Sequence, residues 1–293
     1  MTATIIDGKA IARQVRDEVG ASVERLRAGG IEPGLAVVLV GDDPASVSYV
    51  RGKTRAAEEL GIRSETIRMA GDASQDEVLG LVAELNADER WHGILVQIPL
   101  PRQISESAVA SAVAVEKDVD GLHPVNVGRL FRGEPALLPC TPHGVMQMLA
   151  RGGYDPGGKH VVICGRSNLV GKPLAGLLMQ KAPGANATVT LCHTGTPDIG
   201  RFTRQADIVI AVIGRPHTIT ADMVREGAVV IDVGVSAVPD ATKKSGQRLV
   251  GDVDFDAVAE KAAAITPVPG GVGPMTAARL LYHTVRAAGG GPT

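Results

Sequence analysis

Short apolar runs that alternate with amphipathic stretches are the feature of this sequence that most restricts its fold. The run Gly34–Val40 lies between Pro33 and Gly41, which is typical of a buried strand, and the alternating-charge segment Lys9–Ala28 before it predicts an amphipathic helix. The first half also predicts strands at 65–69 and 93–100 and helices at 45–60, 74–86 and 105–114. Strands separated by helices indicate parallel pairing in an α/β fold.

A loop-rich stretch, Glu116–Pro142, interrupts this alternation, and its prolines and glycines indicate a change of domain. The alternation then restarts, with strands predicted at 160–164, 187–192, 207–213 and 228–235 and helices at 172–180, 198–205, 220–225 and 254–263. A Pro/Gly loop at 266–274 and an amphipathic helix at 275–288 follow. The second half therefore predicts a Rossmann-like, doubly wound parallel sheet, and 293 residues are enough for two α/β domains.

Composition excludes several classes of function. The formal charge is -2 and the chain has three Phe, three Tyr and one Trp, so neither a basic field nor stacking platforms favour a nucleic-acid binder. The longest apolar runs are too short to span a membrane, and the N-terminal segment lacks a hydrophobic signal region. The widely spaced cysteines Cys140, Cys164 and Cys192, and histidines without ligand spacing, predict neither a disulfide framework nor a metal site. We therefore expect a cytoplasmic enzyme or binding protein.

The turn after the first strand of the second half is a candidate phosphate-binding loop. The segment Gly165-Arg166-Ser167-Asn168-Leu169-Val170-Gly171 leads from a strand into a helix, where small residues let backbone N–H groups approach a pyrophosphate. The spacing departs from G-x-G-x-x-G, because Ser167 occupies the position of the second Gly and the final Gly comes one residue late. The glycine pattern alone therefore favours a nucleotide site and a tight non-binding connection about equally.

The end of the next strand indicates the cofactor type. NAD-binding domains place a carboxylate there to bind the ribose 2′-OH, whereas this strand ends in Leu191-Cys192-His193-Thr194. Arg166 adds a fixed positive charge with the geometry to bind a 2′-phosphate. The sequence therefore favours NADP. The ordinary alternatives are a solvated loop charge for Arg166 and a polar strand terminus for His193.

Tyr49 and Lys53 form the candidate catalytic pair of the first half. Asp43 and Pro44 predict the N-cap and the first residue of a helix that begins just beyond a strand end. Tyr49 and Lys53 are four residues apart and share one face of that helix, where a partly desolvated lysine becomes a usable base. By spacing alone, an aromatic ring resting on a surface lysine is the commoner arrangement. Short-chain dehydrogenases also use Tyr-x-x-x-Lys, but there the pair follows the nucleotide loop, whereas here it precedes Gly165.

Two polar residues and one loop complete the candidate set. Gln97 ends a predicted strand, where its amide is suited to orient Lys53 by a hydrogen bond. Asp120 precedes the change of domain and is an acceptor for a planar, amidine-like edge with two donors. Their alternatives are a strand-terminating Gln and an Asp-x-Asp-Gly turn. The loop Pro267–Pro274 is stiff at its prolines and permissive at its glycines, and it is either a cleft wall or a connector to the last helix.

Eight segments, spread over nearly the whole chain, carry a resemblance to a known family. They are Tyr49-x-x-x-Lys53, Val96–Pro101, Asp118–Gly121, Gly165–Pro173, Cys192-His193, Asp232–Gly234, Gly251–Val253 and Pro267–Thr276. In this order they closely resemble the bifunctional methylenetetrahydrofolate dehydrogenase/methenyltetrahydrofolate cyclohydrolase family. The resemblance implies a folate-binding domain of residues 1–140 with the C-terminal 270–293, an NADP-binding domain of residues 141–269, and a cleft between them. It also implies a homodimer, and a place in one-carbon metabolism and purine biosynthesis.

The resemblance also implies roles for individual residues. Lys53 falls on the family's essential lysine, Tyr49 on its folate-stacking tyrosine, Gln97 on its lysine-orienting glutamine and Asp120 on its pterin-recognising aspartate. The substrate-binding residues also include Pro269, Gly270 and Gly271. The nucleotide-binding residues are Gly165, Arg166, Ser167, Val170, Gly171, Thr194 and Val235. Gly195 stands where many relatives carry a basic residue, and Ser236 replaces a usual Asn, so the NADP preference depends more on Arg166.

The expected function is the oxidation of 5,10-methylenetetrahydrofolate with NADP and the hydrolysis of the methenyl product to 10-formyltetrahydrofolate. Oxidation mainly needs alignment with the nicotinamide, because the folate nitrogens stabilise the cation that is left when hydride departs. Hydrolysis needs proton transfer, which we assign to Lys53 held by Gln97. The alternatives are a monofunctional member of the family and a non-catalytic folate- or nucleotide-binding module, whose expected mark is loss of Lys53 or Gln97. The expected partners are tetrahydrofolate derivatives, with no nucleic acid and no membrane.

Overall fold

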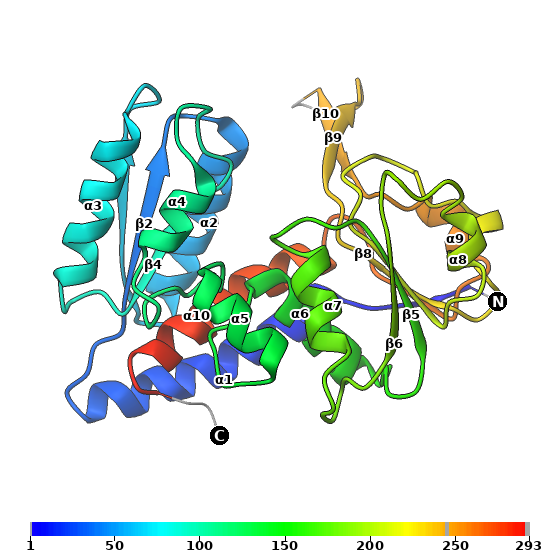
Figure 1. The fold of residues 1–293 in the computed structure, drawn as a ribbon, viewed down its shortest axis with the longest axis horizontal. Coiled ribbons are helices and arrows are strands. Elements are labelled where there is room, and N and C mark those ends of the chain that lie inside the picture. The colour runs from blue at the N-terminus through cyan, green and yellow to red at the C-terminus, as the bar shows by residue number, and fades with distance from the viewer. Residues whose placement is uncertain (1, 244–245, 291–293) are drawn as a thin grey trace. The chain divides into compact units, whose positions relative to one another are not determined.

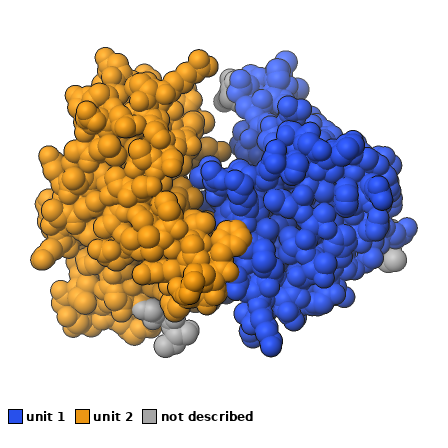
Figure 2. All heavy atoms as spheres, in the orientation of Figure 1, with its two compact units in different colours: residues 1–12, 141–276 blue, residues 13–140, 277–293 orange. Residues whose placement is uncertain are grey.

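The chain divides into two compact units, seen as a ribbon in Figure 1 and as separately coloured spheres in Figure 2. The structure is a computed structural model that describes residues 2–243 and 246–290. Unit 1 contains residues 1–12 and 141–276, and unit 2 contains residues 13–140 and 277–293. The chain passes from one unit to the other within helices α1 (Gly8–Ala28) and α10 (Val272–Ala287) and at the start of α6 (Cys140–Gly152).

Unit 2 is built on a three-stranded parallel sheet in the order β3-β2-β4. The strands are β2 (Gly34–Val40), β3 (Arg63–Met69) and β4 (Gly93–Val96). Every residue of β2 is buried, as expected for the central strand of a sheet covered on both faces. The helices α2 (Pro44–Glu59), α3 (Gln75–Ala87) and α4 (Glu106–Ala112) connect or follow these strands (Figure 1).

The helix starts in unit 2 follow local capping chemistry. The Asp43 carboxylate accepts the backbone N–H of Ser46 at 2.8 Å and Pro44 begins α2, so the predicted cap is confirmed. The loop-rich stretch predicted at 116–142 contains a short helix, α5 (Pro124–Arg132), which was not predicted. Pro124 begins α5 and Gly133, with φ +71°, ends it, so residues that resemble loop punctuation are the boundaries of a short helix.

Unit 1 contains a six-stranded parallel sheet in the order β1-β11-β8-β7-β5-β6, which confirms the expected Rossmann-like α/β class. The strands are β1 (Thr4–Ile5), β5 (His160–Cys164), β6 (Thr188–Cys192), β7 (Ile208–Ala211), β8 (Val229–Asp232) and β11 (Ala264–Ile265). The N-terminal strand β1 pairs with β11, Thr4 opposite Ala264. The two-residue strands β1 and β11 were not predicted, because they are too short to show a periodicity.

Four helical segments of unit 1 are shorter than predicted: α7 (Gly171–Leu178), α8 (Gly200–Thr203), the 3-10 helix η1 (Ala221–Met223) and α9 (Phe255–Ala259). An antiparallel hairpin of β9 (Ser236–Pro239) and β10 (Gln247–Val250) was not predicted. The core between sheet and helices is made of small aliphatic side chains, such as Val162, Val209, Val230 and Val258. In the described part of the chain, no helix is both long enough and apolar enough to cross a membrane.

Candidate active site

Lys53 and Gln97 meet in unit 2. Lys53 lies on α2, which begins just after the end of β2, and Gln97 directly follows β4, the neighbouring strand. The Lys53 ammonium donates to Oε1 of Gln97 at 2.9 Å. The other side of the Gln97 amide, Nε2, donates to the Ile98 carbonyl, which can only accept, so the amide is held with its oxygen toward Lys53.

Tyr49 lies one turn before Lys53 on α2, and its side chain is 51% exposed. A large apolar ring at this exposure has a face free for stacking against a flat ligand.

Asp120 lines a small, mostly apolar pocket in the same unit. The pocket walls come from β4 and the residues after it, from α4 and from the loop before α5: Ile94, Val96, Ile98, Leu100, Val109, Val113, Asp118 and Leu122 are among them. Asp120 and Lys53 both act on the buried thiol of Cys140, since burial and the Asp120 charge raise its pKa while the Lys53 charge lowers it. Lys53 is in contact with Gln97, and Asp120 shares its pocket with Val96 and Ile98, the two chain neighbours of Gln97.

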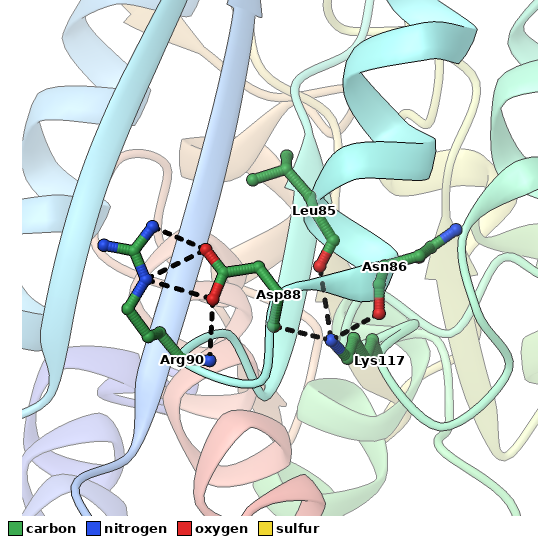
Figure 3. Close-up of polar contacts among 5 residues, drawn as sticks. All are labelled: Leu85, Asn86, Asp88, Arg90 and Lys117. Carbon is green, nitrogen blue, oxygen red and sulfur yellow. Dashed lines mark hydrogen bonds and ion pairs between the residues drawn. The ribbon is translucent and has the colours of Figure 1, made fainter.

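The loop that carries Asp120 is anchored at its start by Lys117. Figure 3 shows the Lys117 ammonium reaching the carbonyl oxygens of Leu85, Asn86 and Asp88 at 3.2, 2.8 and 2.9 Å. These are C-terminal carbonyls of α3, which lack partners within the helix and which favour a nearby cation. Lys117 has no recognisable signal in the sequence, because its partners are backbone atoms distant along the chain.

The next residue, Asp118, fixes the other side of this loop. Its buried carboxylate accepts the backbone N–H groups of Leu122 and His123 at 3.0 and 2.8 Å and the side-chain amide of Asn126 at 2.8 Å. Burial raises the pKa of Asp118 to about 6, although these three donors oppose the shift. The loop thus wraps around the Asp118 side chain, while Asp120 is half-buried at the pocket.

The candidate nucleotide loop in unit 1 follows β5 and is closely packed at its two glycines. Gly165 has φ +134°, and a Cβ there would lie 2.0 Å from the Val212 oxygen. A Cβ on Gly171 would lie 2.1 Å from the Gly165 oxygen. Both positions therefore require glycine, which is the property expected of a turn where a backbone approaches phosphate.

Donors and charge in this loop fit a dinucleotide pyrophosphate. The Ser167 hydroxyl oxygen accepts the N–H groups of Val170 and Gly171 at 3.1 and 3.5 Å, which leaves its own hydrogen available to a ligand. Val170, the N-cap of α7, has no side-chain cap of its own, and Ser167 instead accepts the first N–H groups of the helix. The donor that the loop offers to an anion is therefore the Ser167 hydroxyl, at the positive end of the helix dipole. Arg166 and Ser167 are exposed.

Thr194 and Val235 lie at the same edge of the sheet as this loop. They follow β6 and β8, which flank β5 and β7 in the sheet order, and both are exposed. The turn at Thr194 is rigid, because His193 Nδ1 accepts the N–H of Gly195 at 3.0 Å and Thr196 Oγ1 accepts the N–H of His193 at 3.0 Å. The carboxyl edge of a parallel sheet is where doubly wound folds bind nucleotides.

Two buried carboxylates, which the sequence analysis did not select as site residues, hold the loops of this edge. Asp252 accepts the N–H groups of Ile213, Gly214 and Arg215 at 2.5, 2.9 and 2.9 Å. Asp232 accepts those of Gly234, Asp252 and Val253 at 3.0, 3.0 and 2.9 Å. The loops after β7 and β8 are thereby fixed to each other.

The loop at Pro269, Gly270 and Gly271 also lies in unit 1. Pro269 is exposed, Gly270 has φ +110°, and Gly271 is buried. A Cβ on Gly8 would lie 1.8 Å from the Gly271 oxygen, so the start of α1 packs directly on this loop. No group of three His, Cys, Asp or Glu suited to a metal ion occurs within residues 2–243 and 246–290.

Two family models match the chain over the regions that hold these sites. The tetrahydrofolate dehydrogenase/cyclohydrolase catalytic domain matches residues 6–120, and the tetrahydrofolate dehydrogenase/cyclohydrolase NAD(P)-binding domain matches residues 139–290. The chain belongs to the tetrahydrofolate dehydrogenase/cyclohydrolase family. The expected family, its two activities and the NADP cofactor are thereby confirmed.

Relatives of known name and structure match this family member over nearly its whole length. The bifunctional protein FolD of Dehalococcoides mccartyi strain CBDB1 is 58% identical over 289 residues, which cover 98% of this chain and 97% of the relative. FolD of Moorella thermoacetica is 56% identical, covering 98% and 99% of the two chains. The crystal structure of the bifunctional enzyme FolD from Campylobacter jejuni superposes with a TM-score of 0.92 at 46% identity, covering 98% and 99%. The Trypanosoma brucei enzyme, solved with NADP and an inhibitor, gives 0.93 at 40% identity, covering 99% and 98%.

Proposed function

We propose that Lys53 transfers protons in the cyclohydrolase reaction, with Gln97 orienting it, and that Tyr49 and Asp120 hold the folate. The single observation that carries this proposal is the 2.9 Å hydrogen bond between Lys53 Nζ and Gln97 Oε1 in the unit whose pocket Asp120 lines. We assign folate binding to residues 1–140 with 270–293, which include Gly270 and Gly271, and NADP binding to residues 141–269. Pro269, at the end of the NADP-binding segment, is proposed as a further folate contact.

The dehydrogenase reaction needs positioning rather than a strong acid or base. The two nitrogens beside the bridging carbon of 5,10-methylenetetrahydrofolate stabilise the methenyl cation, so the chain has to hold the folate in line. NADP, when bound, supplies the hydride acceptor. The exposed ring of Tyr49 offers a stacking face for the folate, and the Asp120 carboxylate offers two acceptors to the donor edge of the pterin.

The cyclohydrolase reaction needs a group that moves protons. Water that attacks the methenyl carbon loses a proton, and a folate nitrogen gains one as its bond to that carbon breaks. Lys53 suits both steps in turn, because its neutral amine accepts the proton that water loses and the ammonium formed in this way donates a proton to the folate nitrogen. The bond to Gln97 fixes where Nζ lies in both forms, because the amide oxygen accepts an N–H from the amine as well as from the ammonium.

The preference for NADP over NAD is assigned to Arg166. No Asp or Glu occurs in the turn from His193 to Thr196 after β6, so a 2′-phosphate meets no repulsion there. Arg166 is exposed beside that turn at the end of the neighbouring strand β5. Gly165, Ser167, Val170, Gly171, Thr194 and Val235 are proposed as the remaining nucleotide contacts.

The first experiment is a spectrophotometric assay with 5,10-methylenetetrahydrofolate and either NADP or NAD. Reduced nicotinamide reports the dehydrogenase, and the decay of the methenyl absorbance reports the cyclohydrolase. We expect reduction with NADP, slower reduction with NAD, and enzyme-accelerated decay. Equal rates with the two nucleotides would overturn the role of Arg166, and decay at the rate of the buffer alone would overturn the role of Lys53.

We also propose a cytoplasmic homodimer that assembles through unit 1 and binds no nucleic acid. β6 forms one edge of the six-stranded sheet, and Met179, which follows α7, is 51% exposed. The buried, free thiols of Cys140, Cys164 and Cys192 suit a reducing compartment. Light scattering after gel filtration should give twice the chain mass. Salt-dependent retention on heparin would contradict the absence of nucleic-acid binding.

A further inference from the structure

The carbonyl of Val119, the residue immediately before Asp120, accepts hydrogen bonds from two side chains. Nδ1 of His283 lies 2.9 Å from this oxygen, and Sγ of Cys140 donates to it at 3.2 Å. All of these atoms are buried. A carbonyl oxygen has two lone pairs, so two donors saturate it and fix the plane of the peptide that joins Val119 to Asp120.

His283 can make this bond only as a donor at Nδ1, since a carbonyl has no hydrogen to give. The residue lies on α10 and is 0% exposed. Burial lowers the pKa of His283 to about 3, with the nearby Arg279 charge adding to the effect, so the imidazole is neutral at physiological pH. The hydrogen bond therefore fixes the tautomer, with the proton on Nδ1.

The backbone after Asp120 is held as firmly as the backbone before it. The backbone N–H of Cys140 donates to the Asp120 carbonyl at 3.3 Å. Gly121 has φ +71°, and a Cβ there would lie 2.2 Å from the carbonyl carbon of Leu138. With its neighbours fixed, the direction of the Asp120 side chain depends on the peptide that His283 holds.

We propose that His283 is a positioning residue for folate recognition, whose Nδ1–H bond to the Val119 carbonyl aims the Asp120 carboxylate into its pocket. The proposal rests on the role of Asp120 in binding folate. A histidine on the last helix thus reaches a recognition group more than a hundred and fifty residues earlier in the chain, without touching the substrate itself.

The test compares two substitutions at this position. His283→Leu keeps the approximate bulk and removes the donor, whereas in His283→Asn the amide nitrogen occupies the place of Nδ1 and keeps it. We expect the Leu variant to raise the KM for 5,10-methylenetetrahydrofolate about threefold to tenfold, with kcat and the KM for NADP unchanged. The Asn variant should return the folate KM to within about twofold of the original value. If the Leu variant does not fold, His283→Met removes the same donor with a more adaptable chain.

A double-mutant cycle with Asp120→Ala distinguishes the proposed role of His283 from the proposed role of Asp120 in folate binding. If His283 acts through Asp120, adding His283→Leu to Asp120→Ala leaves the folate KM at the value of the single Asp120 variant. If the two substitutions each raise the folate KM and their effects multiply in the double variant, His283 does not act through Asp120. The positioning role would also be overturned if the single Leu variant left the folate KM unchanged, or raised the KM for folate and the KM for NADP equally. If Asp120→Ala alone leaves the folate KM unchanged, the proposed role of Asp120 fails first, and the role of His283 fails with it.

Discussion

The side-chain amide of Asn126 donates to the Asp118 carboxylate at 2.8 Å, and neither side chain is more than 4% exposed. The same amide nitrogen also donates to the Val115 carbonyl at 2.9 Å. Asn126 of α5 therefore holds together Val115 and Asp118, the two ends of the segment just before the loop that carries Asp120. The titratable carboxyl group of Asp118 is thus part of a buried structural contact.

A pH dependence of stability follows from this contact. The pKa of Asp118 rises from 3.8 to about 6 on folding, so between about pH 4 and 6 the unfolded chain loses this proton while the folded chain keeps it. The contribution of Asp118 to the free energy of unfolding therefore decreases as the pH rises through this range. Relative to Asp118→Asn, the original protein should lose about 3 kcal/mol between about pH 4 and 7, measured by urea denaturation. A difference that stays constant with pH would contradict the raised pKa.

Lys53→Met should reduce the cyclohydrolase rate at least about a hundredfold, because it removes the group that exchanges protons with water and folate. The dehydrogenase rate should fall less, since that reaction depends on alignment. Arg51→Met is the matched control, because it removes an exposed cation two residues away on the same helix. Both rates are measured at saturating folate and NADP. Equal losses of the two activities in the Lys53 variant would show a role in aligning the bound folate for both reactions rather than in proton transfer.

Lys117→Met should lower the free energy of unfolding more than Arg90→Met, although both charged groups lie at the C-terminal end of α3. Lys117 is partly buried and donates to three carbonyls, which its loss leaves without that partner, so we expect about 1–3 kcal/mol of destabilisation. Arg90 pairs with Asp88 in solvent, with its side chain 65% exposed, so we expect its loss to lower the free energy of unfolding much less than the loss of Lys117. Chemical denaturation measures both. A larger loss from the Arg90 variant would contradict the importance given to the Lys117 contacts.

Gly165→Ala and Gly128→Ala should change stability in opposite directions. A Cβ at Gly165 meets the Val212 oxygen and forces a left-handed backbone on alanine, so we expect at least about 1–3 kcal/mol of destabilisation and a weaker affinity for NADP by calorimetry. Gly128 lies within α5 with open space around it, so alanine there should stabilise by about 0.5–1 kcal/mol and leave NADP affinity unchanged. Normal NADP affinity in the Gly165 variant would remove that loop from the nucleotide site.

The sequence predicted the strands of the two sheets well where an apolar run is long and bounded. β2 and β5 have the predicted ends, because Pro33 and Gly41 bracket one and Gly165 ends the other. It failed for β1 and β11, whose pairing depends on residues at the two ends of the chain rather than on any local pattern.

Some residues of the candidate site could likewise be predicted from the sequence, and others could not. Tyr49, Lys53, Gln97 and Asp120 are recognisable because their chemistry is carried by side chains at characteristic spacings. His283 and Lys117 are not, because each acts on backbone carbonyls of a segment far away in the sequence. Only the folded chain shows which carbonyl a buried donor will reach.

The pairing of β1 with β11 also constrains how the chain is made. Thr4 and Ile5 are synthesised long before Ala264 and Ile265, the residues with which they pair. Unit 2 likewise waits for the part of α10 that begins at Ala277. The sheet of unit 1 therefore keeps an unpaired edge at β8, and the core of unit 2 lacks one helix, until these later segments have been synthesised.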